Sequence, residues 1–80
     1  MSDVREQLTR VVKLIVDEPD AVEVSEHPEG RTTLFELTVA PDDLGKVIGR
    51  QGRTARAFRS LLMARGSQDR CRYELEILDG

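Results

Sequence analysis

The chain has 80 residues and a mass of 9.0 kDa, which is enough for one small domain with one hydrophobic core. It contains a single histidine, His27, and a single cysteine, Cys71. This pair cannot build a His/Cys zinc cluster or an internal disulfide, and the sequence has no HExxH, GxSxG or GxxxxGK[ST] motif. No apolar run approaches the roughly 20 residues that span a bilayer, and no signal-peptide pattern opens the chain. We therefore expect a cytoplasmic protein that is not an enzyme and that holds neither a metal nor a cofactor.

Charge is distributed unevenly along the chain. The net charge is -3, which by itself argues against a nucleic-acid partner. From residue 1 to residue 45, four basic residues stand against eleven acidic ones, whereas from 46 to 72 eight basic residues stand against Asp69 alone. Because charges more than about 8 Å apart are largely screened at physiological salt, a local basic patch matters more than the total. The 46–72 segment is either an ordinary solvated helix surface or a face that binds anions.

The first expected element is a helix over residues 2–17. Its buried face would consist of apolar residues at helical spacing, namely Val4, Leu8, Val11, Val12 and Ile15. Asp3 and Glu6 resemble a capping arrangement at its start. Pro19 disfavours helical geometry at Glu18 and should end the helix.

Two strands are expected next, over residues 21–26 and 32–39. Both alternate apolar and polar residues, and the apolar positions are Val22 and Val24 in the first and Phe35, Leu37 and Val39 in the second. The connector, His27-Pro28-Glu29-Gly30, is rich in turn-forming residues. The two strands should form an antiparallel hairpin, with His27 exposed in its connector.

A short helix is expected over residues 41–48. Pro41 suits its first turn, and the carboxylates of Asp42 and Asp43 would lie at the positive end of the helix dipole. Gly49 should end it. Its apolar side would comprise Leu44, Val47 and Ile48.

A longer helix and a third strand are expected to complete the chain. The helix should cover residues 53–65 and end at Gly66, and a polar loop over 67–69 should lead into a strand over 70–78. The inward-facing residues would be Ala55, Phe58, Leu61 and Leu62 in the helix and Cys71, Tyr73, Leu75 and Ile77 in the strand.

The expected order is therefore α-β-β-α-α-β, an α+β arrangement in a single domain over residues 1–80. A strand, two helices and another strand form a crossover, which places the second and third strands side by side and parallel. The first strand pairs antiparallel with the second. We expect a mixed three-stranded sheet with three helices packed on one face.

The connection between the two later helices reads Gly49-Arg50-Gln51-Gly52. Two glycines allow a sharp turn with positive φ and let backbone N–H groups approach a ligand without side-chain obstruction. A helix begins directly after the turn, so its free N–H groups and positive dipole end favour a phosphate at this place. The cations around the turn are Lys46, Arg50, Arg53 and Arg56.

This pattern resembles the KH domain of RNA-binding proteins, whose signature is an apolar pair, a GxxG loop and a helix. The apolar pair here is Val47-Ile48, and the expected element order is that of the type II KH fold. Residues 39–55 (VAPDDLGKVIGRQGRTA) and 14–22 (LIVDEPDAV) are similar to the bacterial KhpA family of small, stand-alone KH proteins.

The resemblance implies binding of single-stranded RNA. A KH domain clamps about four nucleotides, with its GxxG loop on the backbone. Carried over by position, the RNA-binding residues would be Lys46, Ile48, Gly49, Arg50, Gln51, Gly52, Arg53 and Arg56. The segment 66–70 corresponds to the variable loop of type II domains, which forms the opposite wall of the groove, and here it is short and carries Asp69. The three aromatic residues all fall in core-facing patterns, so we expect modest sequence readout without a stacking platform.

The longer helix also offers a surface for self-association. A partly apolar stripe away from its core side consists of Ala57, Ser60, Met63 and Ala64. The resemblance implies a homodimer, or a heterodimer with a larger KH protein of the KhpB type, acting as an RNA chaperone or post-transcriptional regulator linked to cell wall biogenesis and cell shape. Two alternatives stay open: a ribosome-associated assembly factor, and a protein–protein interaction module with a vestigial RNA site.

Overall fold

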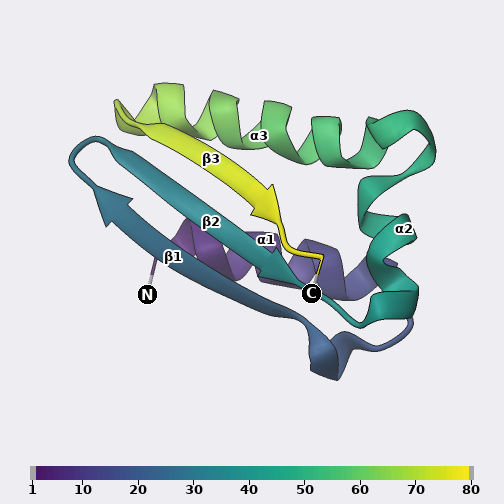
Figure 1. Cartoon of the computed structure of the whole chain (residues 1–80). Helices are drawn as coiled ribbons and strands as arrows, with labels where there is room; N and C mark the ends of the chain where they lie inside the picture. The colour runs from purple at the N-terminus through teal and green to yellow at the C-terminus, as the bar shows by residue number, and fades with distance from the viewer. Residues whose placement is uncertain (1, 80) are drawn as a thin grey trace.

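The computed structural model describes residues 2–79 and shows a three-stranded sheet with three α-helices (Figure 1). In chain order the elements are α1 (Asp3–Ile15), β1 (Glu23–Glu29), β2 (Thr32–Thr38), α2 (Leu44–Ile48), α3 (Arg53–Asp69) and β3 (Arg72–Ile77). Single 3-10 turns occupy Pro19–Ala21, Pro41–Asp43 and Arg50–Gly52. The predicted α+β class and α-β-β-α-α-β order are confirmed. Within residues 2–79, no helix has the length and apolar character needed to cross a membrane.

The sheet has the order β1-β2-β3, with β1 antiparallel and β3 parallel to β2. Phe35 in the central strand lies opposite Glu26 of β1 and beside Leu75 of β3. The parallel pair is joined through α2 and α3, because a crossover must carry the chain back to the starting end of the sheet. The predicted strand pairing is confirmed.

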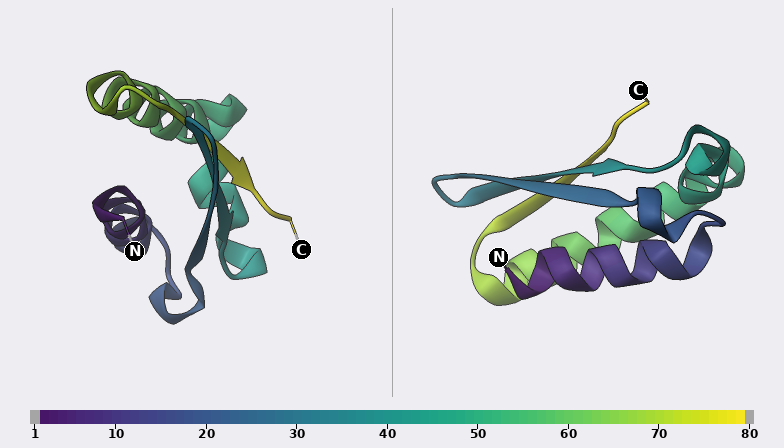
Figure 2. Two further views of the ribbon diagram at one scale, coloured as in Figure 1. Left: turned by 90° about the vertical axis from the view of Figure 1, so that its left-hand side faces the viewer. Right: turned by 90° about the horizontal axis from the view of Figure 1, so that it is seen from below.

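The two long helices, α1 and α3, lie in one layer against the sheet. Figure 2 shows α1 and α3 side by side over one face, while α2 lies beyond the end of the sheet where β2 finishes. The core between these layers includes the fully buried side chains of Val12, Phe35, Leu37 and Val47. Val47 belongs to α2, so the core reaches as far as the turn between α2 and α3.

The hairpin between β1 and β2 is longer and tighter than the sequence predicts. His27, Pro28 and Glu29 continue β1, and the turn lies at Gly30, whose φ is 63°. Pro28 is tolerated because β1 is an edge strand, where a missing N–H interrupts no interior ladder. The prediction of His27 in a loop is wrong, because His27 belongs to β1, whereas its predicted exposure is confirmed. Its ring pairs across the hairpin, with Nε2 2.8 Å from Glu36 Oε1.

The first turn of α1 is capped by Ser2. Its Oγ accepts a hydrogen bond of 3.1 Å from the backbone N–H of Arg5. The predicted cap of Asp3 and Glu6 is therefore wrong, because Asp3 is already the first helical residue. Both carboxylates instead lie in the first turn, where the helix dipole favours negative charge.

Three residues expected in the core lie at the surface. Val11, Ile15 and Leu61 are 42%, 36% and 67% exposed. Val11 and Leu61 line an apolar groove between α1 and α3, which is left because these helices pack on the sheet more closely than on each other. Val16, just beyond the end of α1, is buried in their place.

The helix α3 continues four residues past its expected end. Gly66 lies inside this helix and is buried. A Cβ at this position would lie 2.8 Å from the Cys71 carbonyl oxygen, so the close packing leaves no room for a side chain. Gly66 thus allows the returning chain to pass close to the helix rather than ending it. The helix ends at Arg70, which adopts a left-handed conformation with φ 57°.

Candidate nucleic-acid interface

The connection between α2 and α3 is a tight turn built on positive φ angles. They occur at Gly49 (79°), Gln51 (57°) and Gly52 (74°). The Gly49 N–H donates to the Gly45 carbonyl at 2.8 Å, and the Gly52 N–H donates to the Gly49 carbonyl at 3.1 Å. No side chain caps the start of α3. The N–H groups and the positive dipole end of a 17-residue helix therefore face the turn, an environment that favours a phosphate.

The first glycine of the turn has no room for a side chain. A Cβ on Gly49 would collide with the Thr54 side chain and lie 2.8 Å from the Thr54 backbone nitrogen. Gly52 differs, since its nearest neighbour to such a Cβ would be Arg56 Nη1 at 3.6 Å. Gly49 is therefore required both by its backbone conformation and by close packing, and Gly52 by conformation alone.

Three arginines surround the turn with their side chains in solvent. Arg50, Arg53 and Arg56 are exposed, and among residues 2–79 none of them forms an ion pair. Within the described part of the chain, the only polar side-chain contact of these arginines is a long one, 3.5 Å, from Arg53 Nη2 to Gln51 Oε1. The predicted cations of the loop and α3 are thus gathered around the glycine turn and available to an anion.

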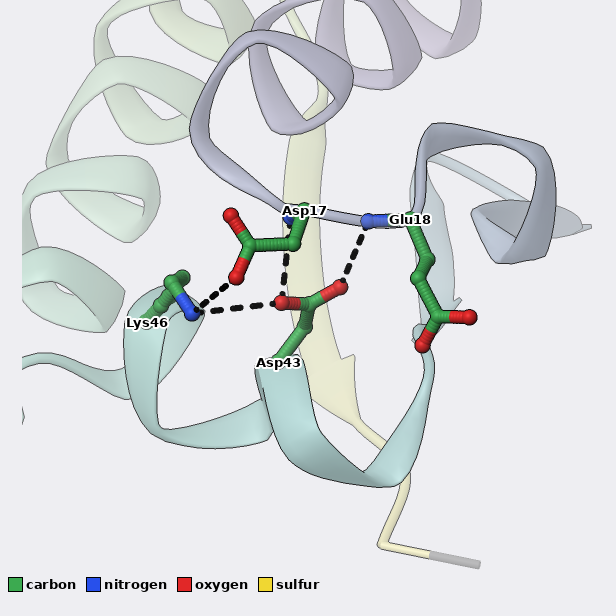
Figure 3. A network of polar contacts seen from close by, with 4 residues as sticks. All are labelled: Asp17, Glu18, Asp43 and Lys46. Atoms are coloured by element: carbon green, nitrogen blue, oxygen red, sulfur yellow. Dashed lines mark hydrogen bonds and ion pairs between the residues drawn. The ribbon is translucent and has the colours of Figure 1, made fainter.

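The fourth predicted cation, Lys46, is engaged elsewhere. Its Nζ lies 2.9 Å from Asp17 Oδ2 and 3.4 Å from Asp43 Oδ1 (Figure 3). The hydrogen bond that Lys46 donates to the Asp17 carboxylate is the main reason why the pKa of Lys46 is raised above its ordinary value. Lys46 thus differs from the arginines, because carboxylates of the same chain already neutralise it.

Asp43 is a residue whose role the sequence does not reveal. It is 1% exposed, and although it lies at the start of α2 as expected, its side chain makes no hydrogen bond that caps this helix. Its Oδ1 accepts the N–H of Asp17 at 3.1 Å and its Oδ2 accepts the N–H of Glu18 at 3.0 Å. These bonds, the one from Asp17 foremost, lower the pKa of Asp43. The partners are about 25 residues away, so no local pattern could identify them.

The apolar pair before the turn divides between core and surface. Val47 is fully buried, whereas Ile48 is 37% exposed directly beside Gly49. An exposed branched side chain next to a turn ringed by cations gives the surface an apolar contact for a base. The candidate site therefore combines a bare backbone turn, free guanidinium groups and one accessible isoleucine.

Comparison with known proteins identifies the domain. The family model described as "KhpA/KhpB, KH domain" matches residues 5–77. The chain belongs to the KhpA/KhpB family of KH domains. The predicted recognition is thereby confirmed, and we call the Gly49–Gly52 turn the GxxG loop after its sequence, Gly49-Arg50-Gln51-Gly52.

Curated relatives match over nearly their whole length. A protein of Halalkalibacterium halodurans named "RNA-binding protein KhpA" is 49% identical over 69 residues, covering 86% of this chain and 91% of its own. Proteins of the same name from Caldanaerobacter subterraneus subsp. tengcongensis and Chlamydia trachomatis are 45% and 43% identical, covering 91% and 94% of this chain and 97% and 96% of their own. No solved structure matches the chain.

The wall opposite the GxxG loop differs from the prediction. Residues 66–69 are helical, so the KH domain has a tight turn at Arg70 in place of a variable loop. The exposed Asp69 side chain is already engaged within the domain, since Tyr73 Oη donates to its Oδ2 at 2.7 Å and Arg65 Nε lies 3.0 Å from the same oxygen. The bond from Tyr73 is the main reason why the pKa of Asp69 is lowered. This end of the domain offers no free loop to a ligand.

The predicted self-association stripe lies on the outer side of α3. Its four residues are exposed, and they are Ala57, Ser60, Met63 and Ala64. The exposed Leu61 extends the stripe toward the groove between α1 and α3, which has a volume of about 270 Å³ and is lined by Val11 and Phe58 among others. The apolar surface of α3 is therefore larger than the sequence predicts.

Proposed function

We propose that this KH domain binds single-stranded RNA in the cytoplasm without catalysis, with its GxxG loop on the sugar-phosphate backbone. The observation that carries the proposal is the open turn of Gly49–Gly52 with three arginines free of ion pairs around it. Its relatives are named RNA-binding proteins. Arginine suits this role because its planar guanidinium group contacts phosphate through two donors.

Recognition of bases should be limited. Phe35 and Phe58 are buried, and Tyr73 packs edge-on against Phe35 with ring centroids 5.6 Å apart. None of these rings is free to stack on a base, so affinity must come from phosphate contacts, N–H groups and Ile48. One small site of this kind binds in the range of about 10⁻⁴–10⁻⁶ M and depends strongly on salt.

The test is a double substitution in the loop, Arg50→Asp with Gln51→Asp. Two carboxylates at the turn should repel phosphate, so we expect a loss of binding to a short single-stranded RNA in a gel shift or fluorescence anisotropy assay. The matched control is Gln7→Asp with Arg10→Asp, which changes the same residue types on the exposed side of α1. Circular dichroism establishes that both variants are folded. Equal binding by the loop variant and the parent would refute the proposal.

Assembly is a second part of the proposal. The exposed stripe on α3, extended by Leu61, supports a homodimer or a heterodimer with a larger KhpB-type protein, in which a second RNA site adds avidity. Such a dimer would suit an RNA chaperone or post-transcriptional regulator. Analytical ultracentrifugation of the parent and of Leu61→Asp measures this directly, and a parent that stays monomeric at high concentration would contradict a homodimer.

Two rival functions make different predictions. A protein-interaction module is favoured by the same apolar stripe, and it predicts that the Arg50/Gln51 double variant keeps its partners while RNA binding is absent even in the parent. A ribosome-associated assembly factor predicts co-sedimentation with ribosomal subunits, whereas a general RNA-binding protein should distribute over many transcripts in crosslinking.

A further inference from the structure

The helix that leads into the GxxG loop is too short to hold its own position. α2 has five residues, and isolated helices of this length are unstable in water. Its orientation must therefore come from tertiary contacts. Two of them are the fully buried Val47 and the close packing of Gly49 against Thr54. A third holds the opposite end of the helix and depends on a buried charge.

This third contact is the Asp43 carboxylate. It points away from α2 and toward the linker between α1 and β1, where its two oxygens accept the N–H groups of Asp17 and Glu18 at 3.1 and 3.0 Å (Figure 3). The side chain is 1% exposed, so water does not compete for these bonds. Charged acceptors make hydrogen bonds roughly twice as strong as neutral ones and demand good geometry. The carboxylate therefore ties the base of α2 to the end of α1.

Lys46 completes the same network from within α2. Its ammonium bridges Asp43 and Asp17, so a single cation balances the buried carboxylate and joins the helix to the linker a second time. To contact a phosphate, the Lys46 ammonium would have to break its ion pairs with Asp17 and Asp43. The buried Asp43 carboxylate would then have no counter-ion. The arginines around the loop have no such cost, since they form no ion pair within residues 2–79.

We propose that Asp43 and Lys46 are positioning residues that fix the GxxG loop, and that Lys46 makes no phosphate contact. The RNA part of this inference rests on the proposed function. The proposal revises the expectation that all four cations near the loop bind the RNA backbone. The three arginines contact the RNA, whereas Lys46 stabilises the position of the loop.

The first experiment measures how RNA affinity depends on salt. The logarithm of the binding constant falls with the logarithm of salt concentration by about 0.7 for each phosphate contact to a single strand. Arg53→Gln should reduce this slope by about 0.7, whereas Lys46→Gln should keep the parental slope even where its affinity is lower. Lys13→Gln, on the exposed side of α1, is the matched control for the loss of one lysine. A slope reduced by about 0.7 in Lys46→Gln would overturn the inference.

The second experiment needs no RNA and examines the position of the loop itself. Asp43→Asn keeps the shape but loses the charge and one acceptor, so in ¹H–¹⁵N spectra the Gly49 and Gly52 amides should shift and the Asp17 and Glu18 amides should lose protection from hydrogen exchange. Asp42→Asn is the matched control, since Asp42 is its exposed neighbour. Loop amides that stay at their parental positions in Asp43→Asn would overturn the positioning role.

The two experiments separate the inference from the proposed function. If the parent chain binds no RNA, the proposed function fails while the spectra still decide the positioning role. If Asp43→Asn is too unstable to study, Lys46→Gln replaces it in the spectra, because the bonds from Asp43 to the linker remain. The same shifts of the Gly49 and Gly52 amides are then expected at smaller amplitude, and unshifted amides would again contradict the positioning role.

Discussion

The two ends of α3 are both rich in arginine, but they present it differently. At the first end, the arginines of the GxxG loop and the first helical turn extend into solvent without a carboxylate partner among residues 2–79. At the last end, Arg65 pairs with Asp69 at 3.0 Å, and Arg72, at the start of β3, pairs with Glu74 at 3.1 Å. The basic segment therefore forms two surfaces. Three arginines without an ion pair lie at the first, whereas at the second Arg65 and Arg72 are paired and Arg70 alone forms no ion pair within residues 2–79.

The difference shows that a run of cations in a sequence is a poor measure of a phosphate-binding surface. An exposed ion pair contributes little to stability, yet it lowers the positive potential that a phosphate meets. The nearest carboxylates decide which arginines remain free. Four predictions test this contrast, from the largest expected effect to the smallest.

At the loop end of α3, the largest effect on the free energy of unfolding is expected from substitution of Gly49. Gly49→Ala places a Cβ against Thr54 and forces a positive φ on alanine, so we expect a loss of about 2–4 kcal/mol in the free energy of unfolding. Urea unfolding followed by circular dichroism measures it. Gly45→Ala is the control, because its Cβ would meet nothing within 4 Å in an exposed helix, and it should stabilise by about 0.5–1 kcal/mol. Similar values for both variants would contradict the role of Gly49.

Stability at the C-terminal end of α3 depends on Gly66, because the chain that follows the helix packs closely against it. Gly66→Ala introduces a contact with the Cys71 carbonyl at 2.8 Å, and backbone cannot move aside as a flexible side chain can. We expect a net loss of about 1–2 kcal/mol, since overpacking exceeds the gain in helix propensity. RNA affinity of the folded variant should be unchanged, because the loop lies at the opposite end of α3. A stabilised Gly66→Ala would show that Gly66 is an ordinary helical glycine.

Removing single charges compares the two ends directly. Arg56→Gln should weaken RNA binding and reduce the salt slope by about 0.7, as expected for one lost phosphate contact. Arg65→Gln removes the same charge from an arginine already paired with Asp69 and should leave the slope at the parental value. Isothermal titration at several salt concentrations provides both numbers. Equal slopes in the two variants would remove the contrast between the ends.

Acid should affect the carboxylates that organise each end. The pKa of Asp43 is lowered by the N–H of Asp17, and the pKa of Asp69 is lowered by Tyr73. A lowered folded pKa means that the folded chain binds fewer protons than the unfolded one, whose aspartates titrate near about 3.9. The stabilisation is therefore present above that pH and is lost as pH falls through the folded values. Thermal unfolding between pH 6 and 2 should show a smaller decline in Asp43→Asn than in the parent, and parallel curves would contradict this.

Local pattern was sufficient to predict most of the fold. The alternation around Phe35 and Leu75 indicated the strands, and the strand-helix-helix-strand order required their parallel pairing. The glycines of the loop were recognised because few residues adopt positive φ. These features depend on neighbours in the sequence, which is why the sequence sufficed for them.

Several differences from the prediction arise from contacts that form only in the folded chain, whereas the cap of α1 was assigned one residue too late. Pro28 looked like part of a turn, yet its position at the sheet edge allows it in a strand. Gly66 looked like a helix end, but the returning chain at Cys71 is what requires it. Asp43 lies at the start of α2 as expected, but the sequence does not reveal that its carboxylate accepts the N–H groups of Asp17 and Glu18. Secondary-structure propensity reflects the preference of a single residue, whereas its contacts depend on how the whole chain folds.

The parallel pairing of β2 with β3 has a consequence for the order of folding. Thr32 pairs with Arg72, so this ladder encloses α2, the GxxG loop and α3 in one long closed segment, and such closures form slowly because their entropy must be lost first. The β1–β2 hairpin closes over a short distance and should form early. The proposed RNA-binding loop lies inside the late-closing segment, so the chain should acquire its binding competence in the same cooperative step that completes the sheet.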